Sequence, residues 1–324
     1  MVQISRRSFM AGAAGSLLVP TALAQYDRYP SRPLQLTHGF GAGGNADVVS
    51  RLFAQKMQDM LKQPVVVDIK SGAGGTIASD YVAKSKPDGY NLVMLTGAHT
   101  VSAALRKSLP FDAVRDFSFI STVTSFPFVI AVRAEHPAKS LQDLLVLAGK
   151  KPDGVTFTSV GVGSTQHMVG EMLGVAAGVK LLHVPYRGGG APVQAVIAGD
   201  VDVLADTLTV ASPHIKSGRL RALAVTSAQA WPSMPGVPPV SAVLKDFEVR
   251  SWLGLAAAAG TPLEIVDLLN KAVRTAAEAP PVKTTLFNLG SESAPSSSVQ
   301  MTGMVKQEIE RWRSVVAKAG IQPQ

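Results

Sequence analysis

The chain has 324 residues, a net charge of +8, no cysteine and a hydrophobic content of 46%. The lack of cysteine excludes disulfides and thiolate metal sites, so a hydrophobic core must provide the stability, and the length is sufficient for two domains. The basic residues form no long run and do not alternate with aromatic residues, so we expect no nucleic-acid partner. The charge favours encounters with anionic solutes instead.

Residues 1–24 predict a cleaved export signal. Arg6 and Arg7 precede a weakly apolar, glycine-rich stretch, and Ala22-Leu23-Ala24 matches a cleavage site. The stretch is too short for a membrane anchor, which needs about 20 apolar residues. The twin arginine indicates the Tat route. We therefore expect a mature chain that starts at Gln25, and its net charge falls from +8 to +6 because only Arg6 and Arg7 are lost.

The first part of the mature chain alternates short apolar runs with stretches of helical periodicity, which is typical of βα units on a mostly parallel sheet. Strands are predicted at residues 34–36, 65–69 and 92–95, and helices at 47–60 and 76–84. These elements predict one lobe that extends to about residue 125.

The alternation starts again near Phe128. Strands are predicted at 129–132, 155–158, 181–184, 201–205 and 222–226, and helices at 140–148, 165–177 and 192–198, with a short one near 213–217. A proline-rich stretch at 231–240 predicts a surface connection, and residues 249–256 predict a further strand. This part predicts a second α/β lobe.

The C-terminal part is predicted to be helical. Pro262 is typical of a helix start, and residues 296–298 are typical of a cap. Apolar residues from Met301 to Val316, including Trp312, recur at steps of three and four, which indicates core packing more than a ligand site. We expect this tail to pack on the first lobe. The predicted domains are a signal peptide at 1–24, lobe 1 at 25–125 plus 250–324, and lobe 2 at 126–249.

Three glycine-rich loops each follow a predicted strand and precede a predicted helix, at residues 39–47, 71–76 and 160–167. The first amides of a helix are unpaired and carry a partial positive charge, so they bind a carboxylate or phosphate without lysine or arginine. Two such loops on opposite lobes would hold an anion between them. The alternative is that the glycines serve only tight turns.

The first loop also permits a different function. Gly39, Gly41 and Gly44 match the dinucleotide-binding pattern G-x-G-x-x-G, and Asp68 ends the next predicted strand, where a ribose-binding acid would lie. A Tat-exported, dinucleotide-dependent oxidoreductase therefore remains an alternative. No set of residues for hydride transfer stands out beside it.

Other catalytic patterns are weaker. Ser164 lies outside a G-x-S-x-G turn, and His167 on the same predicted helix cannot be assumed to reach it as a base. The remaining histidines show no metal-ligand spacing, so we predict no catalytic residue, no metal site and no cofactor. Asp47 reads as a partner of a helix dipole. Asp206, at the end of an apolar strand, is either a cap or a partner for a hydroxyl or amino group of a ligand.

An ordered series of short motifs resembles the Bug family, the extracytoplasmic solute receptors of tripartite tricarboxylate transporters. The series covers nearly all of the mature chain, and its order is more specific than any single motif. Its members are Gly43-Gly44-Asn45-Ala46-Asp47, Ser71-Gly72-Ala73-Gly74-Gly75, Lys86-Pro87-Asp88-Gly89-Tyr90, Gly161-Val162-Gly163-Ser164-Thr165-Gln166-His167, His183-Val184-Pro185-Tyr186-Arg187-Gly188, Gly199-Asp200-Val201-Asp202-Val203, Leu220-Arg221-Ala222-Leu223-Ala224-Val225 and Ser251-Trp252-Leu253-Gly254.

The resemblance implies a two-lobed α/β periplasmic binding protein fold of type II-like architecture, in which each lobe is a sheet flanked by helices and the ligand cleft lies between them. It implies a monomeric, non-enzymatic protein of the Gram-negative periplasm that binds a small organic carboxylate and delivers it to membrane transporter subunits; a sensory role would use the same site. By position, the implied ligand-binding residues are Phe40, Gly41, Ala42, Gly43, Gly44, Asn45, Thr96, Gly97, Gly163, Ser164, Thr165, His167, Asp206 and Thr207.

Overall fold

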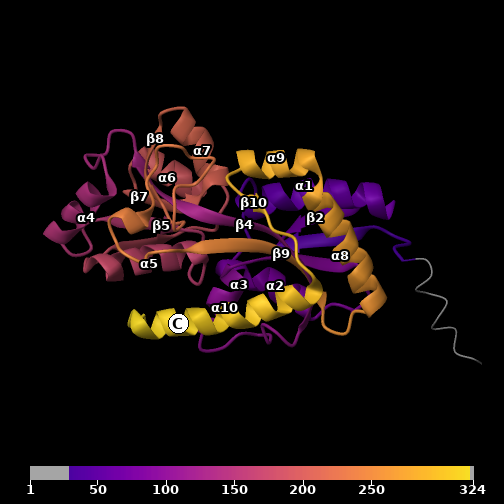
Figure 1. Ribbon diagram of the computed structural model, residues 1–324. Coiled ribbons are helices and arrows are strands. Elements are labelled where there is room, and N and C mark those ends of the chain that lie inside the picture. The colour runs from indigo at the N-terminus through magenta and orange to yellow at the C-terminus, as the bar shows by residue number, and fades with distance from the viewer. Residues whose placement is uncertain (1–28, 322–324) are drawn as a thin grey trace, which may run out of the picture.

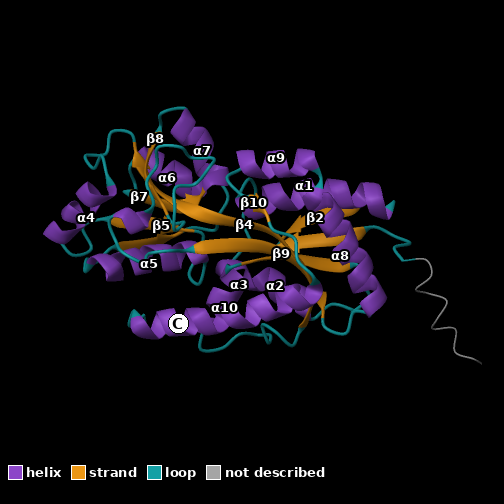
Figure 2. Cartoon of the chain, in the orientation of Figure 1, coloured by secondary structure: helices purple, strands orange, loops and turns teal. Residues whose placement is uncertain are grey.

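The computed structural model describes residues 29–321, so the predicted signal peptide lies outside the described residues. The described chain is a curled mixed sheet with helices on both sides (Figures 1 and 2). Its main path has the strand order β2-β1-β3-β9-β4-β7-β5-β6, and β8 and β10 pair with β4 beside this path. Among the described residues, no helix combines the length and apolar character that crossing a bilayer requires.

The first half of the molecule is built on three parallel strands, in which β1 lies between β2 and β3. On helix α1, Val49, Phe53 and Met57 recur at steps of four and are fully buried, which explains why this segment packs on the sheet as a helix. The elements are β1 (Leu34–His38), α1 (Asn45–Leu61), β2 (Val65–Ile69), a short 3-10 turn η2 (Ala73–Gly75), α2 (Thr76–Ala83), β3 (Asn91–Thr96) and α3 (Ala98–Leu105).

The second half repeats this plan, with β5 parallel to both β6 and β7. Its elements are α4 (Leu141–Lys150), β5 (Thr156–Ser159), α5 (Thr165–Ala177), β6 (Leu182–Pro185), α6 (Ala191–Ala198), β7 (Val203–Thr207), α7 (Leu208–Lys216), β8 (Leu220–Val225) and a 3-10 turn η3 (Val240–Ala242).

Two long antiparallel strands join the halves. Residues 117–127 of β4 (Phe117–Arg133) pair with β9 (Arg250–Ala258), whereas residues 128–133 pair with β7 and β8. Figure 2 shows β4 and β9 running between the two groups of strands. The division therefore falls within β4, and the exact lobe boundaries remain a prediction.

The C-terminal tail returns to the first half. It comprises α8 (Leu263–Glu278), α9 (Pro280–Asn288), β10 (Glu292–Ser293) and α10 (Ser298–Lys318). Helix α10 packs against α3 and β4, and Met301 and Trp312 are buried, which confirms that the apolar stripe is core packing. Ser297 caps α10 in a capping box with Gln300.

Three predicted elements differ from the structure, and one helix was missed. Strand β4 begins twelve residues before the predicted start, because buried Ser121 and Thr124 interrupt its apolar pattern. Helix α7 begins at Leu208 and holds Pro213 in its interior, although proline indicated a helix start. The stretch 231–240 is not a surface connection throughout, because Trp231 and Val240 are buried. Helix α3 was not predicted.

Candidate ligand-binding site

A cavity lies between the two halves, at the carboxyl ends of β1, β5 and β7. The space that the centres of water-sized molecules can reach inside it is about 40 Å³, which corresponds to about three water molecules. It is lined by Phe40, Gly44, Asn45, Ala46, Thr96, Phe126, Phe128, Val160, Thr165, Gln166, Gly189, Asp206, Thr207, Val210, Ser251 and Leu253.

The N-terminal ends of three helices border this cavity. Asn45, Thr165 and Thr207 lie at the starts of α1, α5 and α7, and all three residues line the cavity. No side chain caps the start of α1 or α7, so their first amides are free to bind an anion. None of the described lining residues is lysine or arginine. An anion here would therefore be stabilised by helix ends and neutral donors.

Two buried polar atoms in the cavity wall lack partners in the described protein. Asn45 accepts a hydrogen bond from the Thr209 hydroxyl through Oδ1 at 2.7 Å, which leaves its Nδ2 without a partner. The hydroxyl of Thr207 also has none. Asn45 and Thr207 are only 8% and 4% exposed. An unpaired buried polar group costs about 1–3 kcal/mol, so these atoms indicate a polar ligand.

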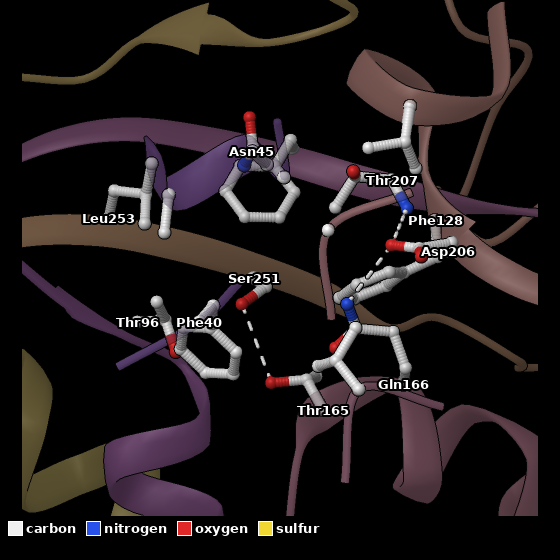
Figure 3. A pocket seen from close by; sticks show the side chains of 16 residues that line it. Phe40, Asn45, Thr96, Phe128, Thr165, Gln166, Asp206, Thr207, Ser251 and Leu253 are labelled. Carbon is white, nitrogen blue, oxygen red and sulfur yellow. Dashed lines mark hydrogen bonds between the residues drawn. The ribbon is translucent and has the colours of Figure 1, made fainter. Parts of the chain in front are cut away.

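Asp206 is the only titratable residue among the described lining residues. Its Oδ1 accepts hydrogen bonds from Gln166 Nε2 at 3.1 Å and from the Thr207 amide at 2.7 Å (Figure 3). No cation contacts it within the described chain, and its burial raises the pKa to about 6, although the hydrogen bonds from Thr207 and Gln166 lower it. Asp206 is thus a buried carboxyl group without a charge partner.

The first glycine-rich loop is held in place by Asp47. Its carboxylate accepts a hydrogen bond from the Gly43 amide at 2.9 Å and contacts His38 Nε2 at 3.2 Å and Arg51 Nε at 2.8 Å. Burial alone would raise the pKa of Asp47, but the bonds from Gly43, Arg51 and His38 outweigh it and the pKa is lowered. Asp47 is therefore an ionised residue in the first turn of α1, as the sequence predicted.

Glycines of the two halves meet backbone to backbone above the cavity. Gly41 forms an isolated bridge with Gly188 and donates to the carbonyl of Arg187 at 3.2 Å. A Cβ atom at Gly41 would lie 3.0 Å from the carbonyl group of Gly188, and one at Gly74 would lie 2.7 Å from the carbonyl oxygen of Val162. Side chains at these positions would separate the halves. The glycine-rich loops thus permit a closed arrangement, which is a use beyond turn formation.

The cavity brings together half of the residues that were predicted as ligand-binding. Phe40, Gly44, Asn45, Thr96, Thr165, Asp206 and Thr207 line it. Gly41, Ala42, Gly43, Gly97, Gly163, Ser164 and His167 do not line it in this closed arrangement, so their assignment to the ligand stays a prediction.

Ser164 and His167 lie behind the cavity wall. The Ser164 hydroxyl accepts a hydrogen bond from the His167 amide and so caps α5, and Nδ1 of His167 accepts one from the Gly163 amide at 3.4 Å. The His167 ring stacks on that of His183, at 4.2 Å between centroids. Burial, and then the neighbouring His167, lower the pKa of His183 to about 4. These contacts give Ser164 and His167 a structural role in the loop and at the start of α5.

Sequence reasoning missed the apolar wall and part of the polar one. Gln166 and Ser251 stood in the quoted motifs but had no assigned role. Phe126 and Phe128 belonged to none of the quoted motifs. They reach the site because β4 runs from one half of the molecule to the other. The missed lining residues are Ala46, Phe126, Phe128, Val160, Gln166, Gly189, Val210, Ser251 and Leu253.

The dinucleotide alternative gains no support from this geometry. The carboxylate of Asp68 contacts Gln35 Nε2 at 2.9 Å and Lys70 at 3.1 Å, and the cavity at the start of α1 has room for about three water molecules. A dinucleotide is far larger than this space. No group of three or more histidine and acidic side chains in residues 29–321 is placed to hold a metal ion.

Comparison with known proteins places the chain among solute receptors. A family model described as the tripartite tricarboxylate transporter family receptor matches residues 49–321. The UPF0065 protein in the tcbD-tcbE intergenic region of Pseudomonas sp. strain P51 is 35% identical, over 98% of this chain and 96% of its own. Protein BugT of Bordetella pertussis is 32% identical over 91% of each chain.

Solved structures agree with the observed fold. Rpa4515 of R. palustris with adipate has a TM-score of 0.88 at 32% identity and covers 91% of this chain and 100% of its own. MatC of Rhodopseudomonas palustris with bound malate has a TM-score of 0.85 at 32% identity and covers 89% and 100%. These likenesses confirm the predicted periplasmic binding protein fold.

Proposed function

The chain belongs to the tripartite tricarboxylate transporter receptor family, as its resemblance to Bug receptors indicated, and on that premise we propose that it captures a small organic carboxylate in the cavity between its halves. The family makes it a periplasmic solute-binding protein. The observation that carries the proposal is a cavity at the starts of α1 and α5, with the buried Asn45 amide unpaired in its wall and no lysine or arginine among its described lining residues.

Carboxylate binding is supported by chemistry and by the relatives. Helix N-termini and a neutral amide donor stabilise a carboxylate without a permanent counter-charge. Adipate and malate, which occur with two relatives of the same fold, are both carboxylates. In our proposal, the ligand carboxylate lies against Asn45 and the α5 start near Thr165, and the two halves close over it as a population shift towards the closed state.

We extend the proposal to the rest of the transport process. The loaded receptor would deliver its ligand to membrane subunits of a tripartite tricarboxylate-type transporter, act as a monomer, and reach the periplasm by Tat export after loss of residues 1–24. The supporting observations are the family membership and the twin arginine at residues 6 and 7. The lobe boundaries near residues 125 and 250 belong to this proposal, because β4 and β9 cross between the halves there.

Replacing Asn45 with alanine should weaken carboxylate binding by about tenfold to a hundredfold. The variant loses a donor to a charged group, and such a hydrogen bond contributes about 1.5–3 kcal/mol. Isothermal titration with the best-binding carboxylate measures the effect.

Ser50→Ala is the matched control for this variant. The Ser50 hydroxyl is also buried on α1 without a partner in the described chain, but the residue does not line the cavity. We expect the control to retain the affinity of the unmodified protein. Equal losses in both variants, or none in Asn45→Ala, would count against the assigned carboxylate position.

A further inference from the structure

The cavity wall holds an acceptor that a carboxylate ligand does not need. Asp206 is 3% exposed and lies at the end of β7, where it faces the same space as Asn45. Both of its hydrogen bonds within the described chain go to Oδ1, from Gln166 and Thr207, and none goes to Oδ2. Figure 3 shows Asp206 and Asn45 as separate parts of the wall around the space. The site therefore offers donors in one place and an open carboxylate oxygen in another.

The charge of the cavity limits what can lie beside Asp206. Asp206 is the only ionisable group among the described lining residues, and no lysine or arginine lies beside it in this wall. A ligand with a carboxylate at each end would place one of them close to Asp206, and like charges in a buried site repel strongly. A hydroxyl or ammonium group there would instead donate a hydrogen bond to Asp206 and so give its carboxylate a partner.

Part of the remaining wall is apolar. Phe126, Phe128, Val210 and Leu253 contribute apolar surface, which cannot compensate for the lost hydration of a charged group. The small size of the cavity favours a short organic acid. Size and polarity thus point to the same group of ligands.

Resting on the proposed function, we propose that Asp206 binds a hydrogen-bond donor of the ligand, so that the cavity selects short monocarboxylates with a hydroxyl or ammonium group over dicarboxylates of similar length. Asn45 and the helix starts bind the carboxylate, and Asp206 determines the specificity for the other end. The Gln166 amide and the Thr207 backbone amide orient the Asp206 carboxylate towards the space.

Titration calorimetry of the full protein, freed of carried-over ligand by unfolding and refolding, tests this proposal. The probes are lactate, 3-hydroxybutyrate, alanine and β-alanine, with propionate and butyrate as acids without the donor and malonate and succinate as dicarboxylates. At least one hydroxy or amino acid should bind about thirtyfold more tightly than the matched plain acid and than both dicarboxylates. The hydroxy and amino acids together show which donor Asp206 receives.

Two variants separate recognition from a structural role. Asp206→Asn keeps an acceptor for Gln166 and Thr207 but loses the charge, so the preference for donor-bearing acids should fall to within about threefold while plain acids still bind. Asp200→Asn removes the same charge at an exposed position and should keep the full preference.

The possible failures are distinguishable. Tighter binding of malonate or succinate, or a preference that persists in Asp206→Asn, would overturn the role of Asp206 and leave carboxylate capture standing. Binding of none of these acids, nor of longer carboxylates, would overturn both proposals.

Discussion

Replacing Gly41 with valine should lower the affinity for the ligand by at least about a hundredfold without unfolding the protein. The three atoms nearest to the added Cβ would be backbone atoms of Gly188 and Gly189, at 3.0–3.1 Å, and both residues belong to the other half of the molecule. The side chain should therefore oppose closure. An open molecule binds with the contacts of one half only, and its apparent affinity falls with the population of the closed state.

Small-angle scattering with and without ligand measures this effect beside the affinity. The unmodified protein should become more compact when ligand is added, and Gly41→Val should not. Gly190→Ala provides the matched control, because a Cβ atom at this neighbouring position meets nothing within 4 Å. Full affinity and normal compaction in Gly41→Val would show that the glycine contact is not required for closure.

Replacing Asp206 with asparagine should stabilise the ligand-free protein at pH 8 by up to about 3 kcal/mol. Burial raises the pKa of Asp206 from 3.8 to about 6 in the folded state. Between these values the unfolded chain has released the proton while the folded chain retains it, so stability falls as the pH rises through this window. Above pH 6 the whole penalty is present, at 1.36 kcal/mol per pKa unit.

Denaturant unfolding at pH 4 and pH 8 tests this expectation. The two proteins should differ by less than about 1 kcal/mol at pH 4, where Asp206 is protonated in the folded state and still partly protonated in the unfolded chain, and the variant should be the more stable one at pH 8. Asp200→Asn removes an exposed carboxylate and should change stability little at either pH. A difference between Asp206→Asn and the unmodified protein that is the same at both pH values would contradict the buried, charge-unpaired state of Asp206.

The sequence predicted the regular βα units well, because their apolar runs and helical periods are local signals. It failed where tertiary structure overrides the local pattern. In β4, Ser121 and Thr124 have the polar side chains of a surface segment, but both are buried in the fold. The Ser121 hydroxyl donates a hydrogen bond to the carbonyl of Ser296. In α7, the neighbouring strands hold a helix that contains Pro213, against its propensity.

The binding site was predictable to the extent that it is made of glycine-rich loops. Asn45 and Thr165 stand at helix starts that follow such loops, and both line the cavity. Thr207 follows no glycine-rich loop, and only the family resemblance indicated it. The contact between Gly41 and Gly188 joins loops about 150 residues apart in sequence, and no local pattern reports such a meeting. Phe128 reaches the cavity only because β4 passes beneath it from one half to the other.

Thermal unfolding of ligand-free protein in the presence of small carboxylates, NAD or NADP tests carboxylate capture most directly. A carboxylate at a hundred times its Kd should raise the unfolding free energy by about 2.7 kcal/mol, which shifts the melting temperature measurably, and the dinucleotides should leave it unchanged. A shift with NAD or NADP and with no carboxylate would contradict the account. It would indicate that the loop from Gly39 to Gly44 binds a dinucleotide.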